Sequence, residues 1–81
     1  MAEKSRFYTP IGKRIQQVTV IQSIAFEEYG INVPYETIHL MLDCREKENH
    51  EMIKQTDFYK NEWRKYCRML EVISWYFKEF E

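Results

Sequence analysis

The segment "YKNEWRKYCRMLEVISWYFKEF", residues 59–80, decides the fold class of this chain. Its large apolar side chains recur at alternating steps of four and three residues. They are Tyr59, Trp63, Tyr66, Leu70, Ile73, Phe77 and Phe80. A repeat with this period places its side chains along one face of an α-helix. We therefore predict a long helix over residues 56–80, with this stripe facing a core.

A first helix is expected over residues 10–29, because both of its ends carry capping signals. Thr9 is a suitable N-cap, and Pro10 fits the first helical position, where its missing N–H is not needed. Gly30 readily adopts the left-handed backbone that often ends a helix. The expected core-facing residues are Ile11, Ile15, Val18, Ala25 and Tyr29, with Ile21 and Phe26 at the margins of the stripe.

A second helix is expected over residues 34–48, since Pro34 pushes the residue before it out of the α region. Its expected inner face consists of Tyr35, Ile38, Met41, Leu42 and Arg45, whereas Leu40 points away. The apolar pattern fades over residues 45–49, where we expect a break. The sequence thus predicts an all-α, three-helix domain at residues 9–81, preceded by a flexible basic arm at residues 1–8.

The composition supports this fold class. The chain has 81 residues, of which 44% are hydrophobic and 31% charged, so one small folded domain is expected and not a disordered chain. Two glycines and two prolines leave too few turn residues for a sandwich or barrel of short strands.

The charge pattern gives expectations for partners and compartment. The net charge is −1 and the isoelectric point is near 6.1, unlike the strongly basic balance that is typical of nucleic-acid-binding domains. No run of 18 apolar residues and no signal-like apolar segment is found, so we expect a soluble, cytoplasmic protein with reduced cysteines. Small virus- or plasmid-encoded regulators are often of this size, and the compartment would then be the host cytoplasm.

The apolar surface of the chain exceeds what three short helices are expected to bury. The last turns of the third helix are apolar on nearly all sides, and Val20 and Ile24 lie opposite the main stripe of the first helix. Monomers rarely expose large apolar patches. We therefore expect a homodimer, or a larger partner protein, to cover Val20, Ile24, Met69, Val72, Trp75, Tyr76, Phe77 and Phe80.

Nucleic acid is the alternative partner. A helix, a glycine turn and a second helix loosely resemble a helix-turn-helix, but the base-reading positions Thr37, His39 and Leu40 carry no cation. A more plausible contact is a basic patch of Lys60, Arg64, Lys65 and Arg68, which lies beside the rings of Trp63 and Tyr66. The competing interpretation of this patch is a solvated surface, in which the cations pair with Glu62 and Glu71.

Catalytic and metal-binding signatures are weak. The soft or imidazole ligands are His39, Cys44, His50 and Cys67, and no pair of them has the spacing of a zinc finger. The two glycines are isolated and form no phosphate-binding loop. We therefore predict no catalysis, no metal and no cofactor. The predicted function is a regulatory or inhibitory module that occludes a surface of a larger protein.

Overall fold

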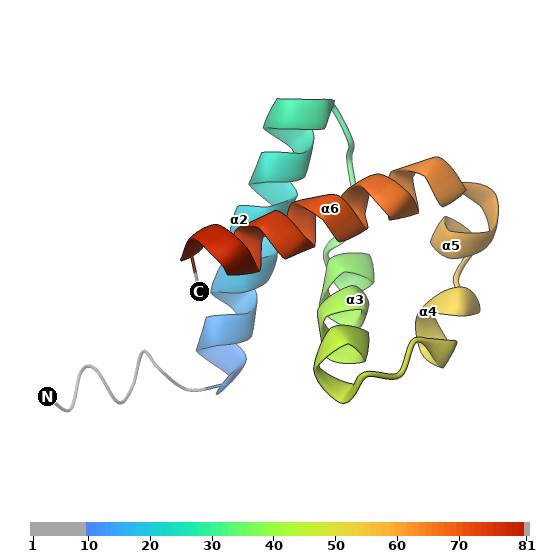
Figure 1. Ribbon diagram of the computed structural model, residues 1–81, viewed down its shortest axis with the longest axis horizontal. Coiled ribbons are helices and arrows are strands. Elements are labelled where there is room, and N and C mark those ends of the chain that lie inside the picture. Colours follow the sequence, from blue (N-terminus) through green and yellow to red (C-terminus); the bar gives the residue numbers. More distant parts are fainter. Residues whose placement is uncertain (1–9, 81) are drawn as a thin grey trace, which may run out of the picture.

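The computed structural model describes residues 10–80, with side chains from residue 12 onwards. Within that part of the chain it contains helices and no strand, so the predicted all-α class is confirmed (Figure 1). The helices are α2 (Pro10–Tyr29), α3 (Tyr35–Lys47), α4 (Glu51–Lys54), α5 (Asp57–Asn61) and α6 (Trp63–Phe80). The basic arm predicted at residues 1–8 lies outside the described residues.

The end of α2 is fixed by Gly30. This residue has φ 66°, and its N–H donates to the carbonyl oxygen of Phe26 at 2.9 Å. The N–H of Ile31 donates to the carbonyl oxygen of Ala25 at 3.1 Å, so two carbonyls of the last turns are satisfied. The chain then runs back along α2, where the side-chain amide of Gln22 donates to the carbonyl oxygen of Val33 at 2.7 Å.

The end of α3 uses the same left-handed geometry without a glycine. Glu48 has φ 53°, its N–H donates to the carbonyl oxygen of Arg45, and the N–H of Asn49 donates to that of Cys44. This pair of bonds is a Schellman motif. The helix therefore ends inside the interval 45–49, where the sequence placed a break. A glutamate in this conformation carries backbone strain that a glycine would avoid.

The prediction that the third helix is continuous is wrong. Instead of one helix over residues 56–80, α5 ends at Asn61 and α6 begins at Trp63, because Glu62 lies outside the helical region with φ −128° and ψ 49°. The bend turns Phe58 into the core, where it is only 7% exposed. Thr56 starts α5 as expected, since its hydroxyl accepts a hydrogen bond from the N–H of Tyr59 at 3.2 Å. The short helix α4 was not foreseen.

The core lies where α6 runs across α2 and where both contact the rest of the chain (Figure 1). Its α6 side is formed by Tyr66, Met69, Val72, Ile73 and Tyr76. The remaining members are Val18, Ile21, Ala25, Ile31, Val33, Ile38, Met41, Leu42, Cys44, Ile53 and Phe58.

The predicted stripe on α6 is therefore rotated from the observed one by roughly 60° about the helix axis, at 100° per residue. Leu70, Trp63 and Phe80 are exposed, whereas Met69 and Val72 are buried. The apolar arc of this helix is so wide that either of two faces could point to the core: the seven-residue stripe or the neighbouring face with Met69 and Val72. We call this choice of inner face the register of α6. The buried register is the one that α2 and α3 can cover.

The predicted stripes on the other two helices need similar corrections. In α2, Ile15, Phe26 and Tyr29 are exposed, while Ile21 is fully buried. Ile24 and Leu40, which were expected to point outward, are partly buried and pack against the core. Tyr35 and Arg45 of α3 are exposed. In α2, the burial of Ile24 follows from the crossing of α6, which covers a flank that the helical pattern alone leaves open.

None of the helices that the structure describes is both long enough and apolar enough to span a lipid bilayer.

The two left-handed positions give a matched pair of substitutions. Gly30→Ala should lower the free energy of unfolding by about 1–2 kcal/mol, because a Cβ at this position meets no atom within 4 Å and the cost is backbone strain alone. Glu48→Gly should raise the free energy of unfolding by about 0.5–1 kcal/mol, because it relieves the same strain. Urea unfolding of both variants measures this. Equal effects of the same sign would contradict the assigned helix ends.

Candidate functional site

A groove of about 290 Å³ lies between the C-terminal end of α2 and the middle of α6. Its walls come from Ile24, Glu28 and Tyr29 on one helix and from Val72 and Trp75 on the other. Val72 is 2% exposed and belongs to the core, so it forms the floor. Trp75 and Tyr29 are 45% and 48% exposed and stand at the rim.

Both rim aromatics are held in place by neighbouring groups. The guanidinium carbon of Arg68 lies 4.7 Å from the centre of the Tyr29 ring, in a cation–π contact that joins α6 to the end of α2. Arg68 also pairs with Glu71 at 2.8 Å. The Trp75 ring meets the ring of Phe80 edge-on, with 5.7 Å between the centroids. Each rim ring therefore already has a packing contact within the chain.

Negative charge gathers at the α2 side of the groove. Glu27 and Glu28 stand in the last turn of α2, where there is no basic residue. Neither forms an ion pair with another described side chain. This is the negative end of the helix dipole, so the two carboxylates lie where they are electrostatically unfavourable. The groove thus combines apolar side chains with a carboxylate that forms no ion pair with another described side chain.

The predicted interface residues divide into three groups. Met69, Val72 and Tyr76 were expected to face outward, and this is wrong because they lie in the chain's own core. Ile24 and Phe77 are partly buried against that core. Val20, Trp75 and Phe80 are exposed, at 36%, 45% and 59%. The structure brings Ile24, Val72 and Trp75 together at the groove.

Phe77 is engaged by a further contact. The guanidinium carbon of Arg45 lies 4.4 Å from the centre of its ring, so a cation from α3 covers the face that the sequence assigned to a partner. The exposed apolar surface of α6 is consequently smaller than expected.

Two groove residues were missed by the sequence analysis. Tyr29 was assigned to the core stripe, and Glu28 was given no role. A signal for Glu28 was present, because adjacent acids in the last turn of a helix without a nearby base break the usual charge pattern.

The basic patch has the geometry of a solvated, ion-paired surface. Lys65 pairs with Glu62 at 2.8 Å, and Arg68 pairs with Glu71 at the same distance. Glu62 and Glu71 are the two carboxylates that the interpretation as a solvated surface expects. Lys60 and Arg64 are exposed. Such pairs contribute little to stability, but they reduce the positive charge that a phosphate backbone would meet.

The aromatic rings beside this patch pack on one another. Trp63 stacks on Tyr66 with 5.6 Å between the ring centroids, and Tyr59 meets both rings edge-on. Burial raises the pKa of the Tyr66 hydroxyl, and the neighbouring Tyr59, Cys44 and Cys67 raise it further. The cluster braces the bend at residue 62. Trp63 nevertheless remains 52% exposed.

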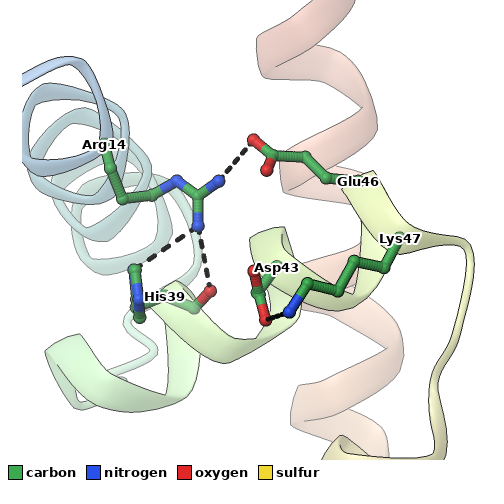
Figure 2. A network of polar contacts seen from close by, with 5 residues as sticks. All are labelled: Arg14, His39, Asp43, Glu46 and Lys47. Carbon is green, nitrogen blue, oxygen red and sulfur yellow. Dashed lines mark hydrogen bonds and ion pairs between the residues drawn. The ribbon is translucent and has the colours of Figure 1, made fainter. Parts of the chain in front are cut away.

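The second polar feature is the network around Arg14, which ties α2 to α3 (Figure 2). Its guanidinium pairs with Glu46 and lies 3.4 Å from Nδ1 of His39, with the carbonyl oxygen of His39 at 3.5 Å. Beside it, Lys47 pairs with Asp43 at 3.1 Å. The side chain of Arg14 is only 14% exposed. His39, a base-reading candidate in the helix-turn-helix interpretation, is thus already engaged within the chain.

The cysteines and histidines do not gather into a metal site. Cys44 is buried, Cys67 is partly buried, and both are free thiols. Across the part of the chain that the structure describes, no three His, Cys, Asp or Glu side chains lie close enough together to hold a metal ion. Cys44 is a member of the hydrophobic core.

Comparison with known proteins found no matching family model, no matching curated protein and no matching solved structure. The groove is therefore interpreted from its own chemistry.

Removal of either carboxylate from the last turn of α2 should stabilise the protein. Glu27→Gln and Glu28→Gln should each raise the free energy of unfolding by about 0.3–1 kcal/mol at low salt, because each removes a negative charge from the negative end of α2. Glu36→Gln is the matched control with the opposite sign, since Glu36 lies in the first turn of α3, where a carboxylate is favourable. Thermal unfolding at low and high salt checks both. A loss of stability in the Glu28 variant would contradict the unpaired state of its carboxylate.

Proposed function

We propose that this protein is a small regulatory or inhibitory module that binds a larger protein and acts by covering part of its surface. The contact surface is the α2–α6 groove together with the exposed Trp75 at its rim. The proposal rests on one observation: a groove that combines apolar side chains, a carboxylate and two half-exposed aromatic rings, on a domain that has already buried its own core.

The composition of the groove supports binding of a protein. Trp and Tyr are residue types in which interface binding energy concentrates, because a large ring loses little conformational entropy when it becomes buried. The floor at Val72 is rigid core, and the rim rings are held by Arg68 and Phe80. A preformed site of this kind spends little free energy on ordering its side chains when a partner binds.

A homodimer is part of the same proposal. Val20, Trp75 and Phe80 remain exposed, and the proposed contact with a second copy is made by Phe80 at the end of α6, next to the groove rim. A two-fold contact through the groove itself has less support, because it would bring the unpaired Glu27 and Glu28 of both copies close together.

Nucleic-acid binding through the basic patch has less support than protein binding. Two of its four cations are paired with carboxylates within the chain, and the aromatic rings beside them stack on one another. Bases would have to displace these contacts to stack there.

The two tryptophans allow a direct test. Trp75→Ala should weaken binding of the partner by about 2 kcal/mol or more, since it removes the principal ring of the groove rim. Trp63→Ala is the control, because its ring is similarly exposed but lies outside the groove; circular dichroism must show that it is folded, since this ring packs on Tyr66. Immobilised wild type and Trp63→Ala should capture the same protein from an extract of the producing cells, and folded Trp75→Ala should not. Equal capture by all three would contradict the site.

Light scattering over a hundredfold range of concentration separates self-association from partner binding. A mass that approaches two chains, and that falls in a Phe80→Ala variant, supports the homodimer. A constant mass of one chain would contradict the homodimer and leave the groove as the sole proposed contact.

A further inference from the structure

The apolar walls of the groove are accompanied by carboxylates on both helices. Glu28 lines the groove itself, and Glu27 precedes it in the last turn of α2. On α6, Glu79 lies four residues after Trp75 and so follows it on the same helix face, one turn further on. All three are exposed, and none forms an ion pair with another described side chain.

The cations Arg68 and Lys78 lie near the groove, and Lys78 follows Trp75 by three residues in the last turn of α6. Arg68, which lies over the ring of Tyr29, pairs with Glu71 at 2.8 Å. The carboxylates of Glu27, Glu28 and Glu79 outnumber the ammonium group of Lys78, so the charges around the groove sum to a negative value, to which the negative end of the α2 dipole adds. A partner surface that approaches these carboxylates must supply positive charge, or it must remove them from water without compensation.

We propose that the groove receives a cationic amphipathic segment, of helical form, from the partner protein. One apolar side chain of that segment enters between Ile24 and Trp75 and rests on Val72. A lysine or arginine one turn away pairs with the carboxylate of Glu28, close to the negative end of the α2 dipole. This inference rests on the proposed function and specifies the chemistry of the partner.

Three physical effects favour this occupant. A cation at the C-terminal end of a helix interacts favourably with the dipole. The half-exposed indole of Trp75 can accept a neighbouring cation on its ring face. An amphipathic helix that lays its apolar side chains into a hydrophobic groove is a common mode of recognition, and a groove between two helices suits it.

A cationic partner also explains why Glu27 and Glu28 occupy an electrostatically unfavourable position at the end of α2. Glu27 and Glu28 lower the stability of α2, and a departure from the usual local charge pattern is expected at a functional site. A bound cation would convert this unfavourable charge into a favourable contact. The same substitution should therefore increase stability and decrease binding, a combination that a purely structural role for Glu28 does not produce.

Three synthetic peptides of equal length serve as probes for the intact chain. The first carries leucine on one helical face and lysine on the other, the second replaces lysine by glutamate, and the third replaces leucine by serine but keeps the lysines. Calorimetric titration should show the leucine–lysine peptide binding at least about tenfold more tightly than either of the others. Its affinity should fall as salt is raised, because the exposed charges become screened.

Variants of the chain locate the site. Glu28→Gln should weaken binding of the leucine–lysine peptide by about threefold to tenfold and reduce its salt dependence. Glu51→Gln is the control, because it removes a carboxylate from α4, which lies away from the crossing of α2 and α6 (Figure 1). This control should leave the affinity unchanged. Trp75→Ala should weaken binding by about tenfold or more.

Each opposing result has a distinct meaning. Equal or tighter binding of the leucine–glutamate peptide, with loss in Trp75→Ala, would overturn the cationic partner and leave the proposed function standing. Equal losses in Glu28→Gln and Glu51→Gln would show attraction by net charge alone and would overturn the inference, as would no binding of the leucine–lysine peptide at millimolar concentration. Unchanged binding in Trp75→Ala would overturn both the inference and the groove as the functional site.

Discussion

The packing of α6 across α2 is the constraint on which the rest of this structure depends. Helix α6 carries apolar side chains over an arc wider than its neighbours can cover. Met69 and Val72 face the core, together with Ile21 and Ala25 of α2, and all four are nearly inaccessible to solvent. The crossing leaves part of the apolar arc beyond the contact, and the groove lies there. Fold and candidate site therefore have a common origin in the orientation of one helix.

Local chemistry explains which structural features the sequence could predict. The helix class, the first helix and the start of α5 follow from short-range signals such as Pro10, Gly30 and Thr56. The end of α3 depends on Glu48 in a left-handed conformation, which sequence patterns associate with glycine. The bend at Glu62 has neither glycine nor proline to announce it. It accompanies the burial of Phe58 in the core, a tertiary contact that local sequence signals do not report.

The candidate site was predictable in part for the same reason. Trp75 and Ile24 were identified because they are apolar where a surface helix is normally polar. The register of α6 was not predictable, since both of its possible inner faces are apolar and only the position of α2 decides between them. That choice moves Met69 from the expected interface into the core, and it brings Glu28 to the wall of the groove. The electrostatic character of the site thus depends on the crossing and not on either helix alone.

The most direct test of this account is the effect of two neighbouring substitutions in α6 on the free energy of unfolding. Met69 is fully buried, whereas Leu70 is 42% exposed. The account predicts that Met69→Ala lowers the free energy of unfolding by about 2–4 kcal/mol, because it leaves a cavity in the core. Leu70→Ala should lower it by less than about 1 kcal/mol. The reverse order would show that α6 buries its seven-residue stripe instead, and would remove both the observed crossing and the groove beside it.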